Sequence, residues 1–159
     1  MPTQTLDRTD RKLLDLLQKD GRLTNLELAN KVNLSPSPVL RRVRALEQAG
    51  LIKQYVALLD AEKIGLGLLA YVTVKLEKKG KMPIESFSRA VQSWPEVVAC
   101  YSMTGDMDYL LRVHVKDLPH FSRFMMESLL KQPGVLDSTS SFALERLKET
   151  TTLPLSGLD

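Results

Sequence analysis

A capping box and a sharp break define two consecutive helices near the start of the sequence. In Thr24-Asn25-Leu26-Glu27, the threonine hydroxyl can accept from the glutamate N–H, and the carboxylate can accept in return from the threonine N–H, so a helix begins here. Asn33 ends the apolar pattern of this helix and tolerates the left-handed backbone of a tight turn. Ser35 can cap the next helix, with Pro36 at its first position, where a missing N–H breaks no bond. Two short helices joined in this way predict a helix-turn-helix.

The segments on either side extend this pattern. Asp7 is placed to cap a preceding helix, and Gly21 is expected to end it. The helix that begins at Pro36 is expected to end at Gly50. Residues 51–58 have strand character and could form a wing or a linker strand. The N-terminal third of the chain therefore predicts three helices and one following strand.

The rest of the chain alternates between strand and helix periodicity. Val72, Val74 and Leu76 point to one side of a half-buried strand over about 68–78. The further elements expected are a turn at 78–81, a helix before Pro95, strands at 97–103 and 109–115, a helix from Asp117 to Pro133, and a strand at 135–148. The order βαββαβ predicts a ferredoxin-like domain, with both helices on one face of an antiparallel sheet. The expected fold class is α+β.

A run containing two glycines, Ile64-Gly65-Leu66-Gly67, separates the two patterns. We expect the helix-turn-helix domain to cover residues 1–60, a linker to cover 61–65 and the ferredoxin-like domain to cover 66–159. A chain of 159 residues buries roughly 70% of its unfolded surface on folding. It can therefore form its cores without metals or disulfides.

The positive charge of the chain is concentrated at its N-terminal end. Residues 1–60 contain ten Lys and Arg against seven acids, whereas residues 61–159 contain twelve of each. Within residues 31–53, five basic residues stand against Glu47 alone. This imbalance favours a polyanionic partner, and an ordinary solvated basic face is the alternative interpretation.

The third helix separates its apolar residues from its basic ones. At about 100° per residue, one side is apolar and must pack on the first two helices, so the opposite polar side projects outward. Arg41 and Arg44 on that side match the guanine edge, and Gln48 matches the adenine edge. Arg42 and Lys53 are better placed for phosphates. The residues predicted to contact double-stranded DNA are Ser35, Ser37, Arg41, Arg42, Arg44, Gln48 and Lys53.

Several functional classes are disfavoured. No run of about 18 apolar residues is present to cross a membrane, and the first residues lack the features of a signal peptide. Cys100 is the single cysteine, which suits a reducing cytoplasm. His114 and His120 stand alone, and no glycine-rich phosphate loop occurs, so we expect no enzyme, no cofactor and no metal site.

Short motifs spread in order over almost the whole chain resemble one family. They lie at residues 6–10, 20–22, 34–38, 40–43, 46–47, 50–52, 105–111 and 130–135. With these motifs the chain resembles the leucine-responsive/asparagine-responsive (Lrp/AsnC, feast/famine) transcriptional regulators, and most of all the leucine-responsive branch. One departure is Asn33, where many members place glycine, and asparagine can adopt the same backbone.

The resemblance implies a winged helix-turn-helix joined to a small-molecule-binding domain of ferredoxin-like topology. It also implies a homodimer that assembles to an octamer, in which amino acids bind at the loop 104–108, where dimers meet. On the same basis, hydroxyls of the segment 137–141 would donate to the carboxylate of the amino acid.

The loop 104–108 by itself allows two interpretations. Glycine and aspartate are ordinary residues of a hairpin turn with solvated acids. Alternatively, Asp106 or Asp108 accepts hydrogen bonds from an ammonium group while loop N–H groups meet a carboxylate, and the resemblance favours this second interpretation. Tyr101 and Met103 either line an apolar pocket or pack in the core. The candidate effector residues are Tyr101, Met103, Thr104, Gly105, Asp106, Asp108, Ser138, Thr139 and Ser140.

Taken together, the sequence predicts a cytoplasmic transcriptional regulator. Its assembly and its DNA binding are expected to respond to a free apolar amino acid of the leucine or methionine class. Two alternatives stay open. One is an architectural protein that compacts DNA with little effector response, and the other is an amino-acid sensor whose helix-turn-helix contacts an enzyme.

Overall fold

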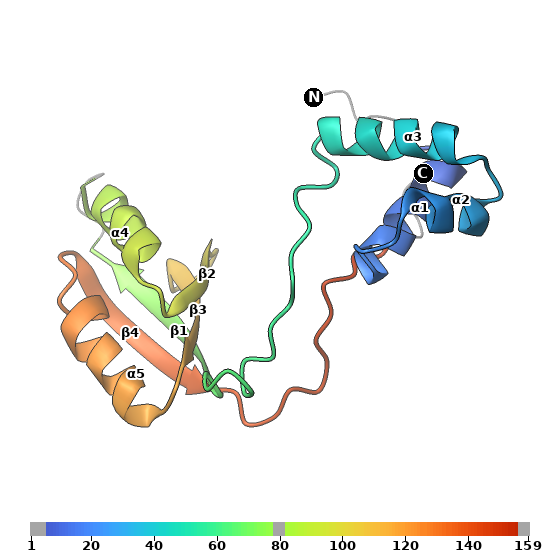
Figure 1. The fold of residues 1–159 in the computed structure, drawn as a ribbon. Helices are drawn as coiled ribbons and strands as arrows, with labels where there is room; N and C mark the ends of the chain where they lie inside the picture. Colours follow the sequence, from blue (N-terminus) through green and yellow to red (C-terminus); the bar gives the residue numbers. More distant parts are fainter. Residues whose placement is uncertain (1–5, 78–81, 156–159) are drawn as a thin grey trace. The chain divides into compact units, whose positions relative to one another are not determined.

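The chain folds into two compact units (Figure 1). The computed structural model describes residues 6–77 and 82–155, so the turn expected at 78–81 lies outside the described residues. One unit, here called the helical unit, consists of Met1–Leu58 together with Lys148–Asp159. The other, the sheet unit, consists of Leu59–Leu147.

The last described residues belong to the helical unit, whereas the sequence expectation places them in the second domain. The Gln18 side chain accounts for this difference. Its Nε2 donates to the carbonyl of Leu153 (3.0 Å), and its Oε1 accepts from the Leu153 N–H (2.9 Å). One amide side chain thus pairs with both backbone groups of a residue far along the chain.

Local capping chemistry sets where the helices of the helical unit begin. The helices are α1 (Arg8–Lys19), α2 (Asn25–Val32) and α3 (Pro36–Gln48). Capping boxes are present at Asp7 and Thr24, which confirms both expected starts. Asn33 is left-handed (φ 56°), and Gly50 follows α3 with φ 71°. The expected turn and the expected end of α3 are therefore confirmed.

Three local features of this unit differ in part from expectation. The helix α1 ends just before Gly21, as expected, but through an extended Asp20, and Gly21 is not left-handed. The Ser35 side chain makes no capping hydrogen bond, although Pro36 begins α3 as expected. Residues 51–58 form no strand, because no neighbouring strand is present in the described chain to take their backbone hydrogen bonds.

A small apolar core holds the three helices together. Its buried members come from all three, and they are Leu13, Leu17, Leu28, Ala29, Val39, Val43 and Leu46. Ala29 is 1% exposed and lies next to the turn, where a small side chain lets α2 and α3 approach closely. The buried side of α3 is the one predicted from its periodicity.

A charged clamp joins α3 to the beginning of α1. Arg42 Nη1 donates to Asp7 Oδ2 and to Asp10 Oδ1, both at 2.7 Å. The Arg42 side chain is 33% exposed and that of Asp10 is 18% exposed, so the pair is partly shielded from water. The Asp10 backbone N–H, and then the Arg42 guanidinium, hold the pKa of Asp7 below its ordinary value.

The linker, which from here on means residues 51–59 after α3, packs back onto the helices through Tyr55. Its hydroxyl donates to Glu47 Oε1 at 3.0 Å. Its ring lies over Gly21, where an added Cβ would come within 3.1 Å of Tyr55 Cδ1. Gly21 is therefore needed for space rather than for backbone conformation. Burial, and then the hydrogen bond to the Glu47 carboxylate, raise the pKa of Tyr55 to about 12.

The sheet unit has the expected βαββαβ order. Its elements are β1 (Leu68–Leu76), α4 (Met82–Ser93), β2 (Val97–Ser102), β3 (Tyr109–Val115), α5 (Leu118–Phe124), the π-helix η1 (Met125–Leu129) and β4 (Val135–Phe142). The strand order is β2-β3-β1-β4, and all three pairings are antiparallel. This is the ferredoxin-like arrangement, and the α+β fold class is confirmed.

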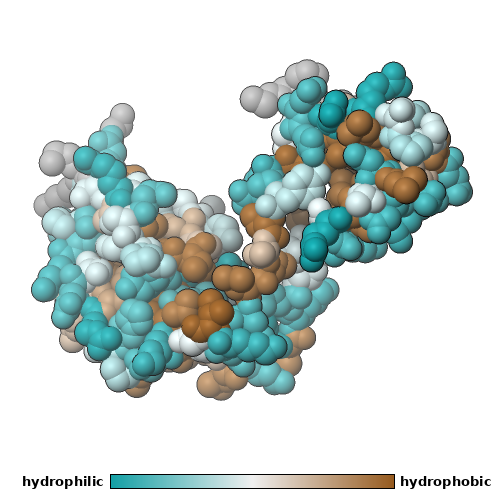
Figure 2. Space-filling view, in the orientation of Figure 1, coloured by the Kyte–Doolittle hydropathy of each residue, from teal (hydrophilic) through white to brown (hydrophobic). Residues whose placement is uncertain are grey.

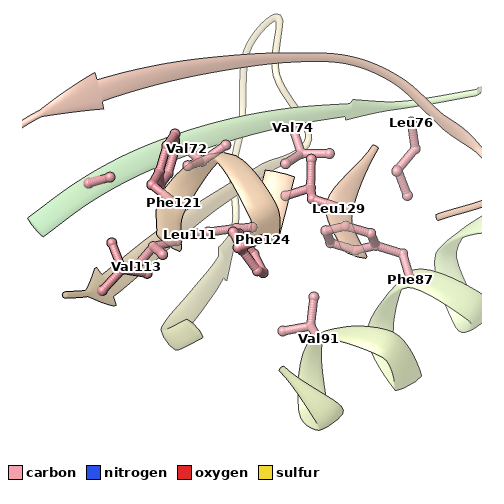
Figure 3. Close-up of a cluster of buried hydrophobic side chains, with 12 residues drawn as sticks. Val72, Val74, Leu76, Phe87, Val91, Leu111, Val113, Phe121, Phe124 and Leu129 are labelled. Carbon is pink, nitrogen blue, oxygen red and sulfur yellow. The ribbon is translucent and has the colours of Figure 1, made fainter. Parts of the chain in front are cut away.

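Alternation along the strands buries one face of the sheet under the two helices. Val72 and Val74 of β1 lie on this face with Leu111 and Val113 of β3. Figure 3 shows Phe87 and Val91 of α4, together with Phe121, Phe124 and Leu129, directed at these strand residues. Ring pairs such as Phe87 with Tyr109 (centroids 4.8 Å apart) strengthen this core.

Two elements of the sheet unit differ from the sequence expectation. The second helix widens into a π-turn, in which Leu130 N–H donates to the Met125 carbonyl (2.9 Å). The strand β4 ends at Phe142 rather than continuing to 148. Its partner β1 begins at Leu68, so the chain beyond residue 143 has no edge left to pair with.

Apolar side chains also remain at the surface of both units (Figure 2). In the linker, Leu58 and Leu59 are 72% and 71% exposed. On the sheet, Tyr101 lies on the face opposite to α4 and α5 and is 56% exposed. Neither α4 nor α5, the helices described in the sheet unit, covers that face. Exposed apolar patches of this kind are typical of surfaces that associate.

We predict that Arg42→Ala destabilises the helical unit. The substitution leaves Asp7 and Asp10 facing each other without their cation, and we expect a loss of about 1–2 kcal/mol in the free energy of unfolding. Urea unfolding followed by far-ultraviolet circular dichroism measures it. The single tryptophan, Trp94, lies in the sheet unit, so its fluorescence reports the other unit and should change less.

Arg41→Ala is the matched control, because Arg41 is exposed on the same helix and makes no ion pair in the described chain. The low pKa of Asp7 stabilises the fold above its ordinary value of 3.8, and this contribution is lost as the pH falls through the folded pKa. The difference between wild type and Arg42→Ala should therefore shrink in acid. Equal stability of both variants at neutral pH would contradict the clamp.

We also predict that Tyr55 ionises at a higher pH than an ordinary tyrosine. Subtracting the tyrosinate absorbance titration of Tyr55→Phe from that of wild type should give a curve with a midpoint at about pH 12, against 10.0 for an ordinary phenol. The neutral phenol is stabilised by the fold, so its contribution is complete below pH 10.0 and is lost as the pH rises through about 12. Glu47→Gln should lower the midpoint without restoring 10.0, since burial remains. A midpoint of 10.0 in wild type would rule out the contact.

Candidate DNA-binding face and candidate effector site

The exposed side of α3 gathers the residues expected to read DNA. Val39, Val43 and Leu46 are buried, which turns the polar side of the helix outward. A shallow hollow on that side is lined by Ser37, Leu40, Arg41, Arg44, Ala45 and Gln48. Four of the seven residues predicted from the sequence therefore lie around one surface feature.

The cations of this side are available to a ligand. Arg41 and Arg44 are exposed, and neither makes an ion pair within the described residues. Ser35 is the N-cap residue of α3, but its hydroxyl makes no capping hydrogen bond. Pro36 and Pro38 have no backbone N–H, so in the first three residues of α3 only the Ser37 N–H is left for a phosphate oxygen.

Arg42 and Lys53 lie apart from the hollow. The Arg42 clamp to Asp7 and Asp10 uses Nη1 for both carboxylates. Lys53 is exposed in the segment after α3. The clamp joins residues more than thirty positions apart, and helix periodicity carries no signal for such a contact.

The loop between β2 and β3 is closed by its own backbone and by β1. Gly105 has φ 113°, a conformation that L side chains rarely adopt. Met103 N–H donates to the Asp108 carbonyl (2.8 Å), and Asp108 N–H donates to the Val74 carbonyl (2.9 Å). The turn interpretation of this loop is therefore correct as far as its backbone is concerned.

The two aspartates of the loop differ in their surroundings. Asp108 Oδ2 accepts from the Leu76 N–H at 2.7 Å, at the point where the register between β1 and β4 shifts. Its carboxylate thus satisfies a backbone group at a bulge. Asp106 is exposed, and its side chain has no hydrogen bond to the described part of the chain. Of the two, Asp106 is the carboxylate open to a ligand.

A hollow of about 270 Å³ lies beside this loop. It is lined by Leu76, Glu77, Ile84, Ser102, Met103, Asp108 and Tyr109. Its size is close to the lower end of small-molecule pockets, which begin at about 300 Å³. Of these seven residues the sequence prediction includes only Met103 and Asp108. Ile84 could not be found from the sequence, because only the packing of α4 against the sheet brings it to this place.

The strand register decides which of the remaining candidates share the hollow's side of the sheet. Ser138 pairs with Val74, which pairs in turn with Tyr109, so Ser138 lies in the row that ends at the loop. Ser140 pairs with Val72, one row further along the same face. Thr139 and Tyr101 occupy the opposite face. The predicted hydroxyls therefore do not all point the same way.

Other chemistry has little support in the described residues. They contain no group of three His, Cys, Asp or Glu placed to bind a metal ion. No helix found in residues 6–77 or 82–155 is both long and apolar enough to cross a bilayer. Burial raises the pKa of the Cys100 thiol, which favours its neutral form.

Both units match descriptions of known domain families. Residues 6–53 match a winged helix-turn-helix DNA-binding domain. Residues 69–153 match the Lrp/AsnC ligand binding domain. The leucine-responsive regulatory proteins of Escherichia coli and Salmonella typhimurium are each 41% identical to this chain over 152 residues, covering 96% of it and 93% of the relative.

Solved structures agree over the same length. The complex of a Neisseria meningitidis transcriptional regulator with L-Met aligns with a TM-score of 0.93 and 49% identity, covering 96% of this chain and 98% of that one. An AsnC family regulator from Agrobacterium tumefaciens aligns with a TM-score of 0.88 and 41% identity, covering 94% and 97%. The chain belongs to the Lrp/AsnC family: it is a DNA-binding transcriptional regulator with an amino-acid ligand-binding domain, and not an enzyme.

Proposed function

We propose that this protein binds duplex DNA through the exposed side of α3 and adjusts that binding to an apolar amino acid held beside the loop 104–108. The observation that carries the proposal is the hollow on α3, around which Arg41, Arg44 and Gln48 gather without partners for the two cations. An exposed, unpaired basic side of a helix fits the major groove.

We assign each predicted residue of this face a proposed contact with DNA. Arg41, Arg44 and Gln48 contact base edges, while Ser35 and Ser37 meet phosphates at the start of α3. Lys53 meets a phosphate from the linker. Arg42 holds α1 against α3 through Nη1, which leaves Nη2 for a phosphate.

The proposed effector is an amino acid of the leucine or methionine class. Asp106 accepts from its ammonium group, and the N–H groups of Thr104 and Gly105 meet its carboxylate. Ser138, Thr139 and Ser140 supply hydroxyls, with Thr139 acting toward another copy because it lies on the opposite face. The apolar side chain of the bound amino acid enters the hollow beside Met103 and Ile84. The L-Met complex of the Neisseria relative supports this choice.

We further propose that the protein acts in the cytoplasm as a homodimer that assembles to an octamer. The exposed apolar residues of the linker and of the open sheet face, including Leu58 and Tyr101, support self-association. Several helical units joined in one assembly gain avidity for adjacent DNA sites. The amino acid shifts this assembly only if it binds one state more tightly than the other.

The DNA-binding proposal predicts that Arg41→Ala/Arg44→Ala loses most of its affinity for a duplex selected from random sequence by the wild-type protein. Each good base contact is worth about 1–3 kcal/mol, so the double variant should bind at least tenfold more weakly at matched salt. Fluorescence anisotropy measures the affinity. Lys116→Ala/Arg123→Ala removes the same charge from the sheet unit and should bind nearly as the wild type does.

Equal loss in both double variants would mean that net charge, rather than the α3 face, carries binding. Wild-type affinity in Arg41→Ala/Arg44→Ala would mean that α3 does not contact DNA. That second result would favour a sensor whose helix-turn-helix contacts another protein.

The effector proposal predicts that leucine or methionine stabilises the sheet unit and that glutamate does not. A ligand at one hundred times its Kd contributes about 2.7 kcal/mol, which corresponds to roughly 10–20 °C in the Tm of a domain of this size. Trp94 fluorescence during thermal unfolding reports it, and light scattering reports the assembly state. Asp106→Ala should lose most of the shift, because the ammonium group loses its acceptor.

Asp15→Ala, which removes an exposed carboxylate from the helical unit, is the matched control and should keep the full shift. A full shift in Asp106→Ala would place the ammonium group elsewhere. No shift with any of the twenty amino acids would favour an architectural DNA-compacting protein instead.

A further inference from the structure

The DNA-facing side of α3 has one acidic neighbour. Glu47 is the only acid between residues 31 and 53, and it is three residues after Arg44 and directly before Gln48. Residues three apart on a helix are close enough for their side chains to pair. A Glu47–Arg44 pair would neutralise a DNA-binding cation and would place a carboxylate near the phosphates.

In the structure, Glu47 is paired with Tyr55 instead. The Tyr55 hydroxyl donates to Glu47 Oε1 at 3.0 Å, and Glu47 makes no ion pair in the described residues. The Tyr55 ring lies against Gly21, and the residue is 48% exposed.

Arg44 lies between two hollows of the helical unit. One contains Ser37, Arg41 and Gln48, the other residues of the DNA-facing side. The second is lined by Gly21, Glu47 and Tyr55 together with core residues, and Arg44 borders it as well. Arg44 and Glu47 thus border the same hollow, in which Glu47 is hydrogen-bonded to Tyr55 and not to Arg44.

We propose that Tyr55 is a positioning residue for DNA binding: it holds the Glu47 carboxylate on the linker side of α3, so that Arg44 remains free for DNA. This inference rests on the proposed role of Arg44. Tyr55 itself touches no base or phosphate. Its effect passes through Glu47, and an effect of Tyr55 substitution should therefore vanish when Glu47 carries no charge.

The test is a double-mutant cycle on the full chain, read as affinity for the selected duplex at matched salt. Tyr55→Phe keeps the ring over Gly21 and removes the hydroxyl, and it should weaken binding about three- to tenfold. Glu47→Gln should bind at least as tightly as wild type. Tyr55→Phe/Glu47→Gln should return to the Glu47→Gln level, which a merely structural role of Tyr55 would not allow.

Arg44→Ala, measured beside the cycle, separates this inference from the proposed function. If Arg44→Ala weakens binding and Tyr55→Phe does not, the inference is overturned and the DNA-binding face stands. If Tyr55→Phe weakens binding and Glu47→Gln fails to restore it, the inference is also overturned. If Arg44→Ala binds as wild type does, the proposed role of Arg44 fails, and the inference fails with it.

Gly21→Ala provides a second route to the same contact, because its methyl group would come within 3.1 Å of Tyr55 Cδ1 and force the ring to shift by a few tenths of an ångström. It should weaken DNA binding, and Glu47→Gln should restore it. Circular dichroism and thermal unfolding of every variant check the fold. A Gly21→Ala variant that is folded and binds DNA like wild type would overturn the inference independently of Tyr55→Phe.

Discussion

The proposed DNA-binding side of α3 depends on the burial of the opposite, apolar side of this helix. Because an α-helix has a period of about 3.6 residues, placing Val39, Val43 and Leu46 in the core forces Arg41 and Arg44 to the opposite side. The position of the cations is thus a consequence of the hydrophobic effect acting on their neighbours. The same burial decides the surroundings of Arg42, which lies at the flank and reaches the acids at the start of α1.

Carboxylates in this chain control where positive charge and backbone donors are used. Asp7 and Asp10 occupy one nitrogen of Arg42, and Asp108 satisfies the Leu76 N–H at a bulge. Glu47 accepts a hydrogen bond from Tyr55 and makes no ion pair with the other cations of α3 in the described residues. Arg44 is left without a partner in the described chain, and it is one of the residues that we propose contact DNA. This division follows from the cost of leaving a partly buried charge unpaired.

The sequence predicted elements well where their signals are local. Capping boxes, a left-handed asparagine and alternating apolar residues depend on neighbours within a few positions, and they correctly predicted α2, the turn at Asn33 and β1. The predictions failed where a distant partner was needed. Residues 51–58 were expected to form a strand but pair with no other strand in the described chain. The strand β4 ends at Phe142, which pairs near the start of its partner β1. Hydrogen bonding between strands is non-local, so residue pattern alone does not set it.

The sequence by itself determined the element order, the family and the side of α3 that bears the cations, because helix and strand periods translate directly into faces. Only the tertiary structure decided which acid meets which partner. Asp108 is the structural carboxylate and Asp106 the open one, although the two lie a residue apart in the same loop. Likewise Gly21 serves Tyr55 rather than the end of α1. These contacts join residues far apart in the chain, and their geometry exists only once the core has brought the elements together.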